Sequence, residues 1–261
     1  MSRSLSKRES EVVLELEWSG RRCVTIKDVS SLLNCSYDYA KKIAQRLVEK
    51  RWFEPIGKGR YLLIGASSGK EGIPNANALL TGSFLVNPYY FSYSTSNAFY
   101  GFSTQMPSTV YIATTKNKHS VKIGNSHYRF IVISGRKFFG FENVRIFDAD
   151  VLMADKEKTI VDSVDKIRYA GGIREVFDVL KNGLKKVDVT RLVDYAVRMG
   201  SNSLIQRLGF LLEDTGIEFN EETLLKHMGR STAFLDPHGE KKGKFHKKWR
   251  IICNISEDLH D

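Results

Sequence analysis

Apolar residues in the first quarter of the chain recur at helical spacing, which predicts three short helices. The first is predicted from about residue 7 to residue 18, with Ser6 and Glu9 in the spacing of a capping box. A second helix follows Thr25, and Asp28 stands in the matching capping position. A third begins after Ser36, whose side chain suits an N-cap. Their apolar faces predict a three-helix core.

The third helix has an apolar side and a polar side, and the polar side starts at its N-terminal end. A recognition helix meets the edges of bases in the major groove with this end. We predict that Gln45 reads a base, because its amide can bond adenine through two hydrogen bonds. The predicted DNA contacts of this helix are Tyr37, Lys41, Lys42, Gln45 and Arg46.

Two short apolar stretches, 52–53 and 61–64, flank a glycine-containing basic loop and predict a hairpin. In this loop Lys58 and Arg60 are the predicted phosphate contacts. Helix, turn, helix and hairpin in this order indicate a winged helix-turn-helix and hence binding to double-stranded DNA. A winged helix that binds protein instead of DNA stays open as an alternative, because a fold does not fix a function.

Composition and charge support a polyanionic partner. The 261 residues carry a formal net charge of +10, and the pI is about 9.4. Residues 1–64 hold 13 Lys and Arg against 8 Asp and Glu, which is half of that excess. Three scattered cysteines predict reduced thiols, and neither a signal peptide nor a membrane span is recognised. We expect a cytoplasmic protein without a cofactor or metal.

A small, polar, glycine-rich stretch predicts the domain boundary. We expect a DNA-binding domain at 1–64, a linker at 65–77 and an α+β domain at 78–261. Strand patterns followed by helical ones favour an antiparallel sheet with several helices over a wound parallel sheet. The strands are predicted at 109–115, 120–123, 128–134, 144–153 and 248–254. The helices are predicted at 76–84, 94–102, 157–167, 172–181, 189–199, 203–212 and 221–228.

Several ordered motifs in the predicted second domain resemble one protein family. They are Pro88-Tyr89-Tyr90, the stretch 107–115, the run 153–162 (MADKEKTIVD) and the Gly171-Gly172 pair that follows it. This pattern resembles AbiEi antitoxins of type IV toxin–antitoxin (abortive infection) systems. The resemblance implies autoregulation through operator repeats bound by the N-terminal domain. It also implies neutralisation of a cognate nucleotidyltransferase-like toxin by the C-terminal domain.

The acidic residues of that run allow a second interpretation, a metal-dependent DNA nuclease with Asp155 and Glu157 at its centre. The strand pattern of such nucleases is incomplete here. Asp155 is a better helix N-cap, and Asp162 can pair with Lys158 one turn earlier. We therefore expect no catalysis, and no catalytic or metal-binding residue is predicted.

A second basic segment lies at 239–250, with six Lys and Arg against one Glu and with Phe245 and Trp249 between them. A solvated loop and a nucleic-acid or toxin contact are both open interpretations, because aromatic residues among lysines can stack on bases. Its basic residues are Lys241, Lys242, Lys244, Lys247, Lys248 and Arg250.

Overall fold

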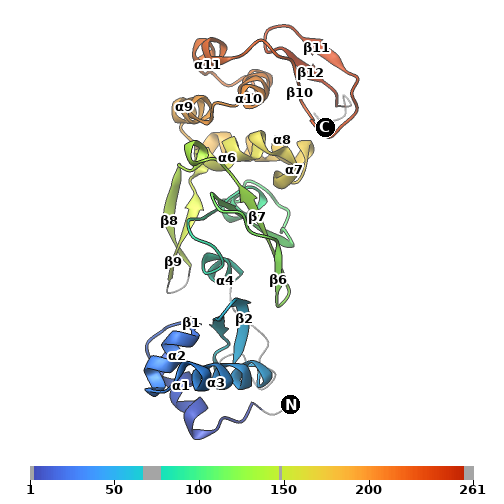
Figure 1. Cartoon of the computed structure of the whole chain (residues 1–261). Helices are drawn as coiled ribbons and strands as arrows, with labels where there is room; N and C mark the ends of the chain where they lie inside the picture. Colours follow the sequence, from blue (N-terminus) through green and yellow to red (C-terminus); the bar gives the residue numbers. More distant parts are fainter. Residues whose placement is uncertain (1–2, 67–77, 147–148, 256–261) are drawn as a thin grey trace. The chain divides into compact units, whose positions relative to one another are not determined.

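The computed structural model describes residues 3–66, 78–146 and 149–255 (Figure 1). The chain divides into two compact units, which are described separately. Unit 1 comprises residues 1–87 together with 121–128, and unit 2 comprises 88–120 together with 129–261. The predicted linker lies outside the described residues from residue 67 onward, and the predicted domain boundaries stay predictions.

The first part of unit 1 is a helical core with a small antiparallel sheet, in the strand order β1-β3-β2. Its apolar centre is formed by Val12, Leu16, Ile43 and Leu47, all fully buried, with residues of α2 and the sheet around them. The elements are α1 (Lys7–Trp18), β1 (Cys23–Thr25), α2 (Ile26–Leu33), α3 (Tyr37–Glu49), β2 (Phe53–Gly57) and β3 (Arg60–Leu63), and α4 (Ala78–Ser83) follows.

Side chains at the helix starts explain why the first two helices begin where they do. The capping box of α1 is present, with the Ser6 amide donating to Glu9 at 2.8 Å. In α2 the Thr25 amide donates to Asp28 at 2.8 Å, and the Asp28 amide donates to the Thr25 hydroxyl at 3.2 Å. Each box satisfies two amides that have no partner inside their helix, so both predictions are confirmed.

The predicted hairpin is present, with a tighter turn than expected. Strand pairing continues to Gly57 and Arg60, so only Lys58 and Gly59 form the turn. Gly59 has a φ of +63°, a conformation that glycine adopts without strain. Strand β2 lies at the edge of the sheet, where the missing amide of Pro55 costs no ladder hydrogen bond. The pairing of β1 with β3 was not predicted.

The main sheet has the strand order β6-β7-β5-β4-β9-β8. The predicted strand 144–153 is wrong, because two antiparallel strands stand in its place, with Ile146 opposite Ala149. The sheet is also mixed and not purely antiparallel, since Phe91 of β4 pairs in parallel with Met153 of β9. The strands are β4 (Tyr90–Phe91), β5 (Thr109–Thr114), β6 (Val121–Ile123), β7 (Ser126–Val132), β8 (Phe141–Ile146) and β9 (Ala149–Ala154).

Helices form most of unit 2 outside its strands (Figure 1). The central one is α6, whose side chains from Glu157 to Val164 are all buried. It contacts α8, α9 and α10. The helices are α5 (Ser94–Phe99), α6 (Lys156–Asp165), α7 (Ile167–Ala170), α8 (Ile173–Gly183), α9 (Val189–Met199), α10 (Asn202–Asp214) and α11 (Glu221–His227), with short 3-10 turns at Gly135–Lys137 and Leu184–Lys186. None of the helices in the described residues has the length and apolarity needed to cross a bilayer.

A three-stranded sheet lies at the end of unit 2, in the order β10-β12-β11. It contains β10 (Ala233–Phe234), β11 (Lys244–His246) and β12 (Ile251–Cys253). Trp249, fully buried, belongs to the same apolar core as α10. An added Cβ at Gly209 of α10 would overlap the Trp249 ring, so this helix position leaves room only for a glycine.

Candidate functional sites

The polar face of α3 is exposed as a row of side chains. Tyr37, Lys41, Lys42, Gln45 and Arg46 are all exposed, and the apolar side of the helix is buried in unit 1. Among the described residues, Lys41 and Lys42 form no ion pair. The helix start is fixed by Ser36, whose hydroxyl accepts a hydrogen bond from the Tyr39 amide at 3.3 Å. The face thus presents one amide and several cations to solvent.

The hairpin turn lies against the N-terminal ends of α2 and α3. The Ile26 amide donates to the Gly59 carbonyl at 3.2 Å. A Cβ placed on Gly59 would lie 3.3 Å from the Ile26 side chain and 3.9 Å from the Tyr37 hydroxyl. The turn and the start of α3 therefore form one continuous surface.

The two predicted cations of the hairpin differ in their surroundings. Lys58 is exposed at the turn, whereas Arg60 is only partly exposed. The Arg60 guanidinium donates to the Phe84 carbonyl and lies 3.9 Å from the Cys23 sulfur. A phosphate contact by Arg60 requires that it leave the carbonyl, so Lys58 is the better placed of the two.

A buried carboxylate holds the C-terminal end of α3 to α1. The Glu9 side chain, 1% exposed, accepts a hydrogen bond from Lys50 at 2.6 Å and lies 3.6 Å from the Arg46 guanidinium. Burial alone would raise the pKa of Glu9, but hydrogen bonds from Lys50 and Ser6 outweigh it and hold the pKa below the ordinary value of 4.5. Arg46 therefore contributes to the packing of unit 1 as well as to the exposed face.

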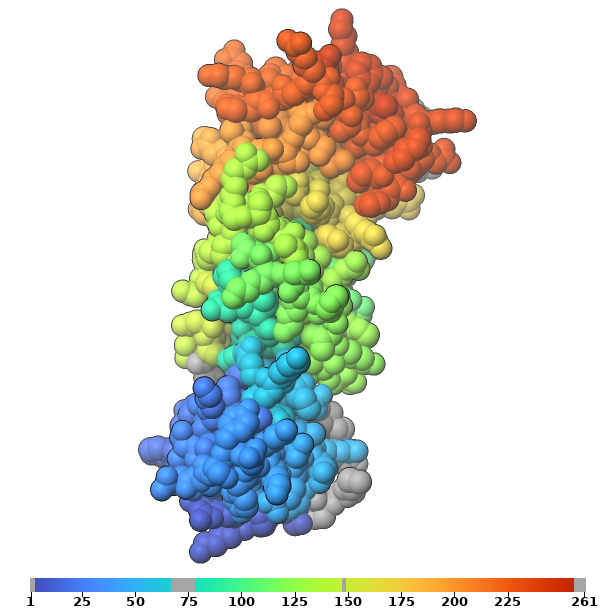
Figure 2. Space-filling model, in the orientation of Figure 1, coloured from blue at the N-terminus to red at the C-terminus, as the bar shows by residue number. Residues whose placement is uncertain are grey.

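The basic segment 239–250 forms β11 and the turn into β12, and side chains of this C-terminal part project from the surface in Figure 2. Trp249 is not available for stacking, because it is fully buried. Lys248 pairs with Glu221 at 2.7 Å and with Glu213 at 3.2 Å. Phe245 is 53% exposed, and Lys242, Lys244 and Lys247 are exposed around it. The exposed cations of the segment are thus fewer than its sequence indicated.

The acidic residues considered for a nuclease are engaged by protein groups. The Asp155 carboxylate caps α6 by accepting from the Lys158 amide at 2.8 Å, and it also accepts from Arg191 at 2.6 Å and from Tyr195 at 2.9 Å. Glu157 accepts from the Asp188 amide at 2.9 Å. Burial raises the pKa of Asp155, against the effect of these hydrogen bonds. Each carboxylate therefore has a structural role, and the prediction of Asp155 as a helix N-cap is confirmed.

One turn further along α6, a buried polar cluster crosses from the helix to the sheet. Lys158 is fully buried and forms an ion pair with Asp162, which is 2% exposed, so the predicted pairing is confirmed. Asp162 also accepts hydrogen bonds from Ser92 at 2.7 Å and from Tyr90 at 3.1 Å. Burial raises the pKa of Tyr90 well above its ordinary value, and the Asp162 charge adds to this effect. The hydrogen bonds of this cluster connect α6 to β4, the strand that begins at Tyr90.

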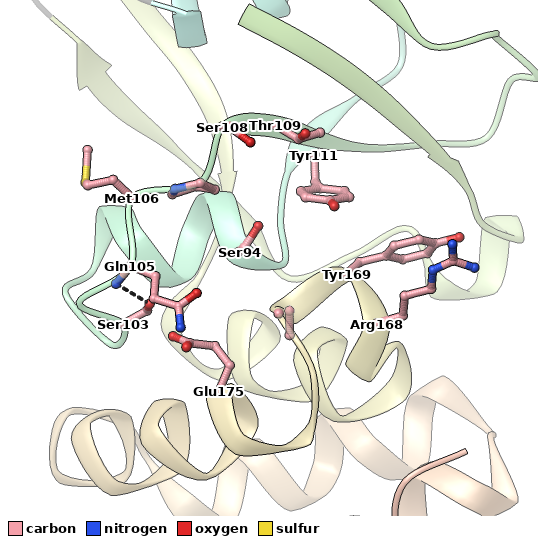
Figure 3. A pocket seen from close by; sticks show the side chains of 13 residues that line it. Ser94, Ser103, Gln105, Met106, Ser108, Thr109, Tyr111, Arg168, Tyr169 and Glu175 are labelled. Carbon is pink, nitrogen blue, oxygen red and sulfur yellow. Dashed lines mark hydrogen bonds between the residues drawn. The ribbon is translucent and has the colours of Figure 1, made fainter. Parts of the chain in front are cut away.

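Two further polar residues, Ser94 and Glu175, were not predicted and line a pocket at the junction of α7 and α8 (Figure 3). Gly171 caps the end of α7 and Gly172 stands at the start of α8. The sequence signal for this site was a carboxylate, Glu175, three residues after the glycine that starts the helix. Its burial could not be anticipated, because it depends on contacts distant in sequence.

The sheet, the surrounding helices and the separate N-terminal core make this an α+β protein, and the order of elements in unit 1 is compatible with a winged helix-turn-helix. Residues 90–214 match the family model described as the AbiEi antitoxin C-terminal domain. These residues therefore form a domain of the AbiEi antitoxin type, and the resemblance predicted from the sequence is confirmed for this part of the chain. The domain supports an antitoxin role in a toxin–antitoxin system.

A solved structure shares the fold over almost the whole chain. It is the crystal structure of the RV2827C protein from Mycobacterium tuberculosis, which matches with a TM-score of 0.69 and 13% sequence identity. The match covers 95% of this chain and 92% of that one. At this identity the likeness concerns the fold alone. No curated protein matches the sequence.

Proposed function

We propose that the chain is a DNA-binding transcriptional autoregulator that also neutralises a toxin. Unit 1 acts as a winged helix-turn-helix that binds operator repeats, and the AbiEi domain binds a cognate nucleotidyltransferase-like toxin. Neither role requires catalysis by this chain. The observation that carries the DNA-binding role is the exposed face of α3, which presents Lys41, Lys42 and Gln45 beside the Lys58 turn.

In this proposal α3 enters the major groove from its N-terminal end. Gln45 bonds a base edge, and Lys41 and Lys42 lie close to the edges or to flanking phosphates. Lys58 contacts a phosphate from the hairpin turn, which lies beside the start of α3. Because phosphate contacts position a protein and base contacts specify a sequence, the residues should have separable effects.

The test measures binding of the chain to the promoter upstream of its own gene. Fluorescence anisotropy of labelled promoter DNA monitors binding at several salt concentrations. Lys41→Ala should weaken binding to all sequences, whereas Gln45→Ala should change the preference among operator variants. Lys7→Ala removes an exposed cation on α1 of the same unit and serves as the matched control. If the wild-type chain does not bind its promoter, or if Lys41→Ala and Gln45→Ala match the control, the assignment of this face is wrong.

The alternative of a protein-binding winged helix predicts no shift of promoter DNA at any salt concentration. The nuclease alternative predicts cleavage with magnesium or manganese that is lost in Asp155→Ala. The antitoxin role is tested by expressing the chain together with the product of the adjacent gene. Restored growth is the expected result, and unchanged toxicity would refute neutralisation.

A further inference from the structure

A pocket of about 260 Å³ lies in unit 2, between the start of α5, strand β5 and the α7–α8 junction (Figure 3). Polar, aromatic and charged side chains line it, and Arg168 and Glu175 are among the charged ones. Ser94 comes from the first turn of α5, Tyr111 from β5 and Tyr169 from α7, and Glu175 comes from the first turn of α8. All of these residues lie within the segment that matches the antitoxin domain.

Glu175 places a buried carboxylate beside the pocket. The residue is 4% exposed, and its Oε1 atom has no hydrogen-bond partner among the described residues. The Ser94 hydroxyl oxygen is also buried, and it has no hydrogen-bond partner within the part of the chain that the structure describes. Buried polar groups are nearly always hydrogen-bonded, and an unsatisfied one is costly. Each of these two buried oxygens beside the pocket therefore has unused hydrogen-bonding capacity.

Glu175 stands in the first turn of α8, close to the N-terminal end of that helix. The adjacent backbone also holds its side chain closely. Gly171 has a φ of +112°, and an added Cβ there would lie 2.9 Å from the Glu175 Cγ. In Figure 3 the Glu175 carboxylate points toward the side of the pocket where Ser103 and Gln105 lie, and not into the helix core.

Aromatic rings form the other wall of the pocket. The centroids of the Tyr111 and Tyr169 rings are 5.7 Å apart, and the rings are tilted by 36°. The Arg129 guanidinium lies 5.2 Å from the Tyr169 ring centroid, so this ring already makes one cation–π contact. A carboxylate with free acceptor capacity opposite aromatic rings suits a planar cation that donates several hydrogen bonds.

We propose that this pocket binds the guanidinium group of an arginine side chain presented by a protein partner. The guanidinium donates to the Glu175 carboxylate and to the Ser94 oxygen, and its plane or its alkyl stem lies against the tyrosines. The assignment of the partner as the toxin rests on the proposed function. The recognition of guanidinium does not, because it follows from the pocket alone.

The experiment titrates the full chain, labelled with ¹⁵N, with N-acetyl-arginine amide and follows the amide signals around Gly171 and Glu175. We expect saturable shifts confined to the pocket. N-acetyl-citrulline amide has nearly the same shape but no charge, and it should bind at least tenfold more weakly. Glu175→Gln should weaken the arginine probe about tenfold or more, since a hydrogen bond between ions is lost. Glu222→Gln, an exposed glutamate in the first turn of α11, should change nothing.

Three outcomes would overturn the proposal: no saturable shift in the pocket, equal binding of the citrulline probe, or unchanged affinity in Glu175→Gln. Ser94→Ala provides a second variant if Glu175→Gln fails to fold, and it should weaken the probe severalfold. Free L-arginine distinguishes the source of the ligand. If it binds tenfold more tightly than the capped amide, a small metabolite and not a displayed side chain is the ligand.

The two proposals can fail separately. If the wild-type chain neutralises the toxin but the arginine probe does not bind, only the pocket assignment is wrong. If the probe binds but the wild-type chain does not neutralise the toxin, the proposed function is wrong, and the guanidinium site remains without the toxin as its partner. If both hold, Glu175→Gln should weaken the complex with the toxin, whereas Glu222→Gln should not.

Discussion

Replacing Lys158 with methionine should destabilise unit 2 strongly. The side chain is fully buried and forms an ion pair with Asp162, which is also buried. Methionine keeps most of the volume and removes the charge. The Asp162 carboxylate then stays buried with only Ser92 and Tyr90 as donors. Breaking a buried ion pair in this way costs about 3–5 kcal/mol. Because two neutral donors remain, we expect about 3 kcal/mol, the lower end of that range.

Hydrogen exchange followed by mass spectrometry measures this effect locally. Peptides that cover α6 report its opening free energy, which is useful because a chain with two units need not unfold in one step. A cost of about 3 kcal/mol raises the open population more than a hundredfold. Lys156→Met is the control, since Lys156 lies on the same helix and is exposed. It should change the opening free energy by less than about 0.5 kcal/mol.

A double variant separates the ion pair from the packing around it. Lys158→Met with Asp162→Leu removes both charges, so the carboxylate is no longer left alone. The double variant should cost at least about 1.5 kcal/mol less than the two single variants together. Additive costs would refute a pairwise interaction. A cost for Lys158→Met equal to that of Lys156→Met would refute the reasoning as a whole.

Three further predictions concern other parts of the chain. Because hydrogen bonds hold the pKa of Glu9 below 4.5 in the folded state, the stability that Glu9 provides is complete above that pH and is lost as the pH falls through the lowered pKa. In urea titrations at a series of pH values, Glu9→Gln should reduce the loss of unfolding free energy at acidic pH. An unchanged loss would contradict the assignment. Gly209→Ala should lower the free energy of unfolding by about 1–3 kcal/mol or more, because the methyl group overlaps the Trp249 ring. The melting temperature should fall accordingly. Lys58→Ala should reduce the slope of log K for promoter binding against log salt concentration by about 1. An unchanged slope would exclude a phosphate contact.

Local patterns were sufficient for much of the secondary structure. The capping boxes of α1 and α2 depend on residues three positions apart, and the predicted helix 189–199 coincides with α9. The Lys158–Asp162 pair also follows from spacing, because residues four apart lie on one helix face. In each case the decisive interaction is made within about one helical turn.

Features that depend on distant partners were missed. The stretch 144–153 contains neither glycine nor proline, so its alternating pattern gave no sign of two strands. Strands β1 and β4 have only three and two residues and exist because of their pairing partners. The basic neighbours of Trp249 suggested exposure, although its ring packs on α10. The Phe84 carbonyl that binds Arg60 lies 24 residues away in sequence.

The burial of Trp249 also bears on how much of the chain the antitoxin domain requires. The family match ends at residue 214, yet the indole ring covers Gly209 and lies 6.1 Å from the Phe219 ring, centroid to centroid. A protein shortened at Asp214 would uncover that side of α10 and expose apolar surface to water, a condition that favours aggregation. The autonomous folding unit therefore extends past the boundary of the family match, and any truncation study must retain the terminal sheet.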